Sequence, residues 1–155
     1  MARVLAFEKV VIACDHAGFA LKERLKRALS KAGIEFEDLG TQGKEDVDYP
    51  DYAQKAAGWV AKGRNIAGIL ICGSGIGMCI SANRCRGVRA AACWNVKIAK
   101  IAREHNNANV LCLGARVLKA NEAEKIMLAF LATGFCNEER HLRRISKIES
   151  QGAMG

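Results

Sequence analysis

The sequence is poor in proline and has no long apolar segment. Its 155 residues include one proline against 15 glycines, which indicates tight turns rather than rigid linkers. No apolar run approaches the ~18 residues that a membrane-spanning helix needs. The first residues also lack the extended apolar region of a secretory signal peptide. These absences lead us to expect a cytoplasmic protein that does not bind a membrane.

Cysteines with the spacing of a metal site are also missing. The seven cysteines are an odd number, and no two have the C-x-x-C spacing of zinc and redox sites. Several lie inside apolar runs, which favours buried free thiols in a reducing compartment over a disulfide framework. His16, His105 and His141 each stand beside another polar residue, but none has a metal-ligand spacing with carboxylates. We therefore predict neither a metal nor a cofactor.

Basic residues outnumber acidic ones by 24 to 16, and the formal charge of +8 suits an anionic partner. The one local cluster comprises Arg140, Arg143, Arg144 and Lys147. No aromatic residue interleaves it, which disfavours base stacking and a nucleic-acid partner. A solvated helix face is the commonplace interpretation. Because Arg140 and Arg144 are one helical turn apart, however, both can bind one phosphate.

Short β-branched apolar runs alternate with amphipathic stretches along the chain. Strands are predicted at residues 10–14, 34–39, 67–72, 88–93 and 109–113. Helices are predicted at residues 17–32, from 50 through 60, from 76 onward, and at 96–104, 121–132 and 138–149. This alternation is typical of an α/β fold, a single doubly wound, Rossmann-like domain with a five-stranded parallel sheet flanked by helices. We expect one domain over residues 1–155, with a core of about 9–149 and a short frayed tail at 150–155.

Polar residues follow three of the predicted strands, at the edge where such sheets bind ligands. They occupy positions 15–16, 72–75 and 114–116. His105 and Asn106 differ, because they end a predicted helix and precede the fifth strand. We therefore expect a ligand site at the carboxyl ends of the strands.

The loop from Cys72 to Gly77, Cys-Gly-Ser-Gly-Ile-Gly, is the strongest local signal. Its three glycines allow a tight turn that exposes consecutive backbone N–H groups at a helix N-terminus, where an anion is stabilised. A turn without a ligand explains the same residues equally well. No Gly-Lys-Ser/Thr follows, which excludes a Walker loop, and the third glycine comes one residue too early for a dinucleotide fingerprint.

Cys72 lies where this anion site would begin. A thiol beside a helix N-terminus and near cations loses its proton more readily, so Cys72 is a candidate base. Inert burial is the alternative. Cys14, Cys93 and Cys112 also lie near strand ends, so position alone does not single out Cys72.

Eight short motifs follow one another along the chain. They are Cys14–Gly18, Asp48–Pro50, Ile71–Gly77, Ala82–Asn83, Gly87–Ala90, Glu104–Asn106, Gly114–Arg116 and Arg140–Arg144. Together they resemble the ribose-5-phosphate isomerase B family, which belongs with the subunits of galactose-6-phosphate isomerase, over about residues 10–148. The resemblance implies an aldose–ketose isomerase of the pentose phosphate pathway, interconverting ribose 5-phosphate and ribulose 5-phosphate through an enediolate.

The resemblance also implies catalytic roles. Cys72 would be the base that moves a proton between C1 and C2 of the sugar, and Asp15 and His105 would open the ring. Ser74 would assist backbone N–H groups in stabilising the enediolate oxygen. Those N–H groups belong to Gly73, Gly75, Ile76 and Gly77.

Substrate-binding roles follow from the same resemblance. Tyr49 would line the pocket and Asn106 would bind sugar hydroxyls. The phosphate would be held by His16, Arg116, Arg140 and Arg144. In the family the site lies at a dimer interface, where the other subunit donates the residues matching His105, Asn106 and Arg116. A homodimer with shared sites, or a tetramer, is therefore the expected assembly.

Two other functions stay open. One is isomerisation of a six-carbon sugar phosphate, such as allose 6-phosphate or galactose 6-phosphate. The other is a non-catalytic phosphate-binding module, which would need neither a thiol base nor ring-opening residues.

One branch of the family uses a glutamate just after the glycine loop as its base. Met78 and Cys79 stand there, so this chain resembles the cysteine branch, and the basic stretch at 84–86 has no functional explanation.

Overall fold

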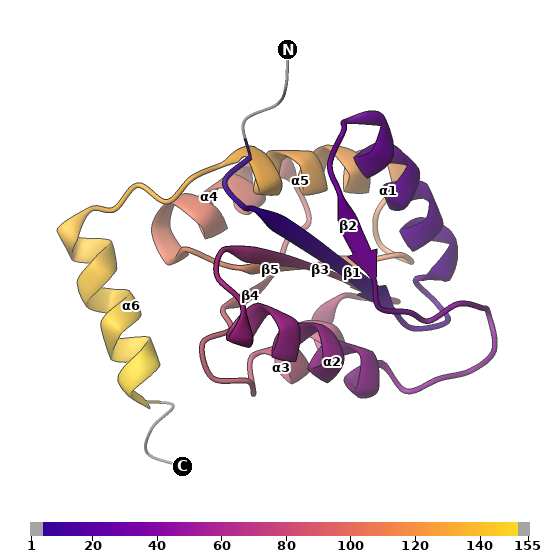
Figure 1. The fold of residues 1–155 in the computed structure, drawn as a ribbon, viewed down its shortest axis with the longest axis horizontal. Coiled ribbons are helices and arrows are strands. Elements are labelled where there is room, and N and C mark those ends of the chain that lie inside the picture. Colours follow the sequence, from indigo (N-terminus) through magenta and orange to yellow (C-terminus); the bar gives the residue numbers. More distant parts are fainter. Residues whose placement is uncertain (1–4, 152–155) are drawn as a thin grey trace.

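A single sheet of five parallel strands forms the centre of the computed structural model, which describes residues 5–151. The strands are β1 (Lys9–Cys14), β2 (Phe36–Asp38), β3 (Ile66–Cys72), β4 (Ala90–Ala92) and β5 (Val110–Gly114), in the order β2-β1-β3-β5-β4. The helices are α1 (Phe19–Lys31), α2 (Tyr49–Lys62), α3 (Ile76–Ala82), α4 (Val96–Asn106), α5 (Ala120–Ala132) and α6 (Glu139–Gln151). The predicted doubly wound α/β fold with a five-stranded parallel sheet is confirmed (Figure 1).

Helices cover both faces of the sheet (Figure 1). α1, α4 and α5 pack on one face and α2 and α3 on the other, and each layer encloses its own apolar cluster. Successive side chains of a strand point to opposite faces, so a strand covered on both sides is apolar throughout. In β1, Val10, Ile12 and Cys14 enter one cluster, while Val11 and Ala13 enter the other. Burial on both faces therefore explains the apolar run that predicted this strand.

The two edge strands are shorter than the sequence predicted. β2 covers residues 36–38 rather than 34–39, and β4 covers 90–92 rather than 88–93. Within the described sheet, β2 pairs with β1 alone and β4 with β5 alone, each over three positions. Ile34 and Val88 lie just outside these strands and are buried. Their apolar character therefore reflects packing rather than strand pairing.

α6 lies beside the β4 end of the sheet and follows an extended segment after α5 (Figure 1). Its last turn is held by an ion pair of 2.6 Å between Arg89 Nη1 and Glu149 Oε1. The Ser150 hydroxyl donates to the Lys147 carbonyl at 2.9 Å. Residues 150 and 151, which the sequence assigned to a frayed tail, belong to α6 in the structure. Residues 152–155 of that tail lie outside the described residues.

The cysteines differ in their exposure. All seven lie within the described residues and are free thiols. Cys14, Cys72, Cys93 and Cys112 are buried, and Cys136 is exposed.

Among the helices of residues 5–151, none is long and apolar enough to cross a membrane.

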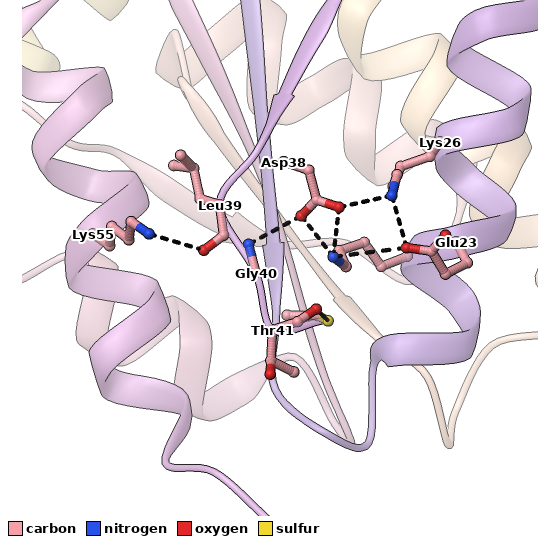
Figure 2. A network of polar contacts seen from close by, with 9 residues as sticks. Glu23, Lys26, Asp38, Leu39, Gly40, Thr41 and Lys55 are labelled. Carbon is pink, nitrogen blue, oxygen red and sulfur yellow. Dashed lines mark hydrogen bonds and ion pairs between the residues drawn. The ribbon is translucent and has the colours of Figure 1, made fainter. Parts of the chain in front are cut away.

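A buried polar network ties α1 to the segment that follows β2 (Figure 2). The Lys22 side chain is 0% exposed, and its Nζ lies 2.6 and 2.7 Å from the two carboxylate oxygens of Asp38. Lys26 Nζ lies 2.8 Å from the same carboxylate, which also accepts the Gly40 N–H at 3.0 Å. Gly40 in turn accepts the backbone N–H of Cys14 at 2.6 Å. The network thus fixes residues 38–40 beside the carboxyl end of β1.

Candidate active site

The site lies at the carboxyl ends of β1 and β3, the central neighbours from which the chain continues in opposite directions across the sheet. Such a switch point opens a crevice outside the sheet. Here it is a cavity of about 610 Å³. Its lining includes Asp15, Tyr49, Cys72 and Arg116, together with most of the loop 73–77. The fold therefore brings the strand-end residues that the sequence singled out into one place.

Cys72 is the last residue of β3 and is only 4% exposed. The backbone N–H of Gly75 donates a hydrogen bond to its Sγ at 3.1 Å. Gly75 has a φ of +81°, a left-handed conformation that favours glycine, and this turn carries its N–H back to the sulfur. Ser74 Oγ accepts the next N–H, that of Ile76, at 3.1 Å. The glycine loop is thus folded around the thiol at the cavity wall.

Tyr49 and Arg116 are held against this loop by close approaches that glycine permits. A Cβ on Gly77 would lie 2.6 Å from Tyr49 Cζ, and a Cβ on Gly73 would lie 3.1 Å from Arg116 Nη1. The Arg116 backbone N–H also donates to the Gly73 carbonyl at 2.9 Å. The resemblance implied that Arg116 is donated to a partner's pocket, whereas within one chain Arg116 also lines the Cys72 cavity. Because residues 114–116 continue β5, which neighbours β3, Arg116 lies over the loop of its own chain.

Asp15 and His16 follow β1 but differ in their surroundings. The Asp15 carboxylate is buried, lines the cavity and accepts the Gly18 N–H at 3.1 Å. His16 Nδ1 accepts the Val47 N–H at 3.1 Å, and its Nε2 lies 3.6 Å from Asp46 Oδ1. The acidic loop before α2 therefore holds the His16 ring beside the site, while Asp15 faces into it.

The remaining predicted residues form a second group at the junction of α4 and α6. His105, near the end of α4, stacks on His141 of α6 with ring centroids 4.5 Å apart and an interplanar angle of 12°. Arg140 Nε pairs with Glu138 at 2.8 Å. Asn106 lines a different cavity of about 450 Å³ beside the basic stretch at 84–86. Within one chain, these residues do not line the Cys72 cavity.

We call the two groups the cysteine half-site and the histidine half-site. The cysteine half-site comprises Asp15, His16, Tyr49, Cys72–Gly77 and Arg116. The histidine half-site comprises His105, Asn106, Arg140, His141 and Arg144. The structure brings the members of each group together, but it does not join the two groups within one chain.

His141 was given no role by the sequence, yet it is buried at 4% exposure. Burial lowers its pKa, and electrostatic interactions with His105, Arg140 and Arg144 lower it further. The ring is therefore neutral near pH 7. The apolar pattern of α6 would not have found it, because Leu142 and Ile148 are about half exposed while His141 is buried.

The structure also separates Cys72 from the other strand-end cysteines. Burial raises the pKa of Cys14 and of Cys93 to about 12, and raises that of Cys112 well above its usual range. These three thiols are therefore protonated at neutral pH. On α3, a hydrogen bond from Cys112 outweighs burial and lowers the pKa of Cys79 to about 7, but Cys79 does not line the Cys72 cavity. Of these five, Cys72 is the thiol that faces the site.

Known proteins resemble this chain over most of its length. The sequence profile of the ribose/galactose isomerase family matches residues 10–148. Ribose-5-phosphate isomerase B of Escherichia coli is 40% identical over 141 residues, covering 91% of this chain and 94% of that protein. A solved ribose 5-phosphate isomerase from Thermotoga maritima is 50% identical, with a TM-score of 0.88 over 92% of this chain and 97% of that one. The Mycoplasma genitalium ribose-5-phosphate isomerase B, solved with bound ribulose-5-phosphate, is 40% identical, with a TM-score of 0.91 over 98% and 100%. The predicted resemblance is confirmed: this chain belongs to the ribose/galactose isomerase family, alongside the ribose-5-phosphate isomerases B.

Proposed function

We propose that this chain interconverts ribose 5-phosphate and ribulose 5-phosphate, with Cys72 as the base. The observation that carries the proposal is the joint presence of Cys72, Asp15 and Arg116 in one cavity at the switch point of a family fold. A phosphorylated sugar supplies an anion for the guanidinium. Its carbonyl chain supplies a proton acidic enough for a positioned base.

The cysteine half-site fits the two demands of an enediolate mechanism. The Cys72 thiolate removes the proton from C2 of the open-chain aldose, and the electron pair of that C–H bond forms the C1=C2 double bond. The carbonyl oxygen on C1 then carries the negative charge, which backbone N–H groups of residues 73–77 stabilise. Return of the proton to C1, with transfer of the hydroxyl proton from O2 to O1, gives the ketose. None of these steps needs a metal.

The histidine half-site supplies what the cysteine half-site lacks. Ring opening needs a second proton-transfer group beside Asp15, and we assign this role to His105. We assign Asn106 to the sugar hydroxyls and His16 to the phosphate. Arg140 and Arg144 lie one turn apart on α6, where both guanidinium groups can reach one phosphate.

We further propose that a homodimer joins the two half-sites. Support comes from the rim of the Cys72 cavity, where Ile76, Ile80 and Val117 are 59%, 63% and 67% exposed. Large exposed apolar side chains gathered at the rim of a cavity are typical of a surface that a protein partner covers. A partner seated there buries these side chains and brings its own His105, Asn106 and α6 arginines to Cys72.

The free thiols support a cytoplasmic location, because a reducing compartment keeps them unpaired.

The decisive experiment is a turnover assay on ribose 5-phosphate with a metal chelator present. We expect undiminished isomerisation, and faster turnover on ribose 5-phosphate than on allose 6-phosphate or galactose 6-phosphate. Preference for a six-carbon substrate would reassign the substrate but keep the mechanism. Binding of sugar phosphates without turnover of any of them would refute the isomerase.

A further inference from the structure

Three potential ligand groups converge where the chain passes from α5 to α6. They are the Cys136 thiol, the Glu138 carboxylate and a ring nitrogen of His141. The three donor atoms all lie within 4.8 Å of one another. The proposed isomerisation uses none of these groups directly.

The backbone fixes this arrangement. The Cys136 N–H donates to the Glu104 carbonyl at 3.2 Å, which ties residue 136 to the end of α4. Asn137 adopts a φ of +58°, and this turn redirects the chain into the helix. The His141 N–H then donates to the Glu138 carbonyl at 2.9 Å, so residues 138 and 141 lie on one side of the first turn of α6. These backbone contacts therefore fix the positions from which the side chains of Cys136, Glu138 and His141 extend.

His141 brings an independent sign of a missing partner. It is 4% exposed, and its Nε2 has no hydrogen-bond partner within residues 5–151. Buried polar nitrogens are nearly always paired in folded proteins, so an orphan requires an explanation. A ring nitrogen without a hydrogen-bond partner is free to bind a metal ion.

The geometry points to a binding site for one divalent transition-metal ion of the zinc class, held by Cys136, Glu138 and His141. A thiolate and an imidazole select Zn²⁺ and similar ions over Mg²⁺ and Ca²⁺, which prefer oxygen ligands. Bonds of about 2.0–2.3 Å place tetrahedral ligands about 3.3–3.8 Å apart, so modest side-chain rotation closes the site. The spacing C-x-E-x-x-H matches none of the familiar zinc-ligand spacings, so the sequence alone gives no sign of this site.

The surrounding charges allow such an ion. A thiolate and a carboxylate together carry two negative charges, which balance a divalent cation. Glu138 already pairs with Arg140 at 2.8 Å, but both side chains are more than half exposed. Exposed ion pairs contribute little stability, so a metal can take over the carboxylate.

Occupancy of this site would act on the histidine half-site. His141 stacks on His105, and Glu138 is the ion-pair partner of Arg140. An ion bound to His141 and Glu138 therefore alters the contacts of His105, the proposed ring-opening group. It also alters the contacts of Arg140, a proposed phosphate ligand. We expect Zn²⁺ to inhibit the isomerase, and this part of the inference rests on the proposed function.

The test uses the reduced, chelator-treated full-length chain and does not depend on catalysis. Titration with Co²⁺ should give one ion per chain and a thiolate-to-cobalt absorption band, and calorimetry with Zn²⁺ should give the same stoichiometry. Cys136→Ser should remove the band and weaken Zn²⁺ binding by more than about 10-fold, the lower bound for losing even an outer-shell group. Cys136 is exposed, so this variant should fold normally. Cys85→Ser is the matched control and should bind as the wild type does.

Two results would overturn the metal site: no cobalt band in the wild type, or an unchanged band in Cys136→Ser. Inhibition by Zn²⁺ is scored separately, in the turnover assay. It should disappear in Cys136→Ser, whose metal-free activity should match that of the wild type. Binding without inhibition would refute the link to the histidine half-site while leaving the metal site intact. A chain without isomerase activity would still give a decisive cobalt titration.

Discussion

Replacing the buried Lys22 with methionine tests how the polar network beside β1 is held together. Methionine keeps the length and apolar stem of the side chain but removes the charge that contacts both Asp38 oxygens. Removing one partner of a buried ion pair costs about 3–5 kcal/mol, because the other charge is left without compensation. Here Asp38 keeps Lys26 at 2.8 Å and the Gly40 N–H, and its side chain is 15% exposed. We therefore expect a loss of about 3 kcal/mol, at the lower end of that range.

Lys26→Met is the matched control, since Lys26 contacts the same carboxylate from a more exposed position. Its loss leaves the Lys22 contacts intact, so we expect about 1 kcal/mol or less. Urea unfolding of both variants and of the wild type at pH 7 gives the comparison. If Lys22→Met costs no more than Lys26→Met, the buried contacts do not anchor this segment.

The same variants carry a pH signature. Burial alone raises the pKa of Asp38, but hydrogen bonds from Lys22, Lys26 and Gly40 outweigh it and lower the pKa below 3.8. A carboxyl group with a lowered pKa in the folded state stabilises the protein above its ordinary pKa, and this stabilisation is lost as the pH falls through the folded value. The stability difference between the wild type and Lys22→Met should therefore be largest above pH 4 and shrink below it. A difference that stays constant down to acid pH would contradict the assignment.

Three further predictions concern the two half-sites and the neighbouring thiol. Replacing Arg140 or Arg144 with alanine should remove about 1.5–3 kcal/mol of binding to the phosphate, and so lower kcat/KM on ribose 5-phosphate about 10–150-fold. Residual activity on free ribose should barely change. Mixing Cys72→Ala with His105→Ala chains, each inactive alone, should restore one complete site per mixed dimer. The pH profile of Cys79 alkylation, followed by peptide mass spectrometry, should have its midpoint near 7, because its lowered pKa makes the thiolate the major form above that pH.

Each of these predictions has a clear contrary result. Equal losses on ribose and ribose 5-phosphate would show that the α6 arginines do not bind the phosphate. No recovery after verified subunit exchange would show that the two half-sites do not combine across an interface. A Cys79 midpoint near 9, the value of an ordinary thiol, would show that the hydrogen bond from Cys112 does not stabilise its thiolate.

The sequence predicted the central strands well and singled out Asp15 and Cys72, which the fold brings to one cavity, for one physical reason. A strand buried on both faces is a continuous apolar run, and the polar residues that end it must lie at the ligand-binding edge of the sheet. Asp15 and Cys72 were found in this way. The edge strands were predicted too long because Ile34 and Val88 are buried without being paired, and sequence pattern does not distinguish these two conditions.

Contacts between distant segments could not be predicted from local pattern. The stacking of His105 on His141 depends on how α6 packs against α4, which no spacing along the chain encodes. The position of Arg116 over the glycine loop of its own chain depends on the pairing of β5 with β3. The thiols show the same limit, because the pKa of Cys79 is set by Cys112, 33 positions away along the sequence (112 − 79).

The central claim is that Cys72 is the base, and replacing it with serine tests this most directly. Serine is similar in size, but its hydroxyl is far less acidic than a thiol and is a poor base without help. Cys79→Ser is the matched control, because Cys79 has a more acidic thiol than usual but does not line the Cys72 cavity. Turnover, affinity for ribose 5-phosphate and deuterium uptake from solvent at C2 should be measured on the folded variants. Cys72→Ser should bind the substrate normally while turnover and exchange fall by roughly 10²–10⁴-fold, and Cys79→Ser should keep most of its activity. A folded Cys72→Ser protein with near-normal turnover and exchange would contradict the assignment of the base.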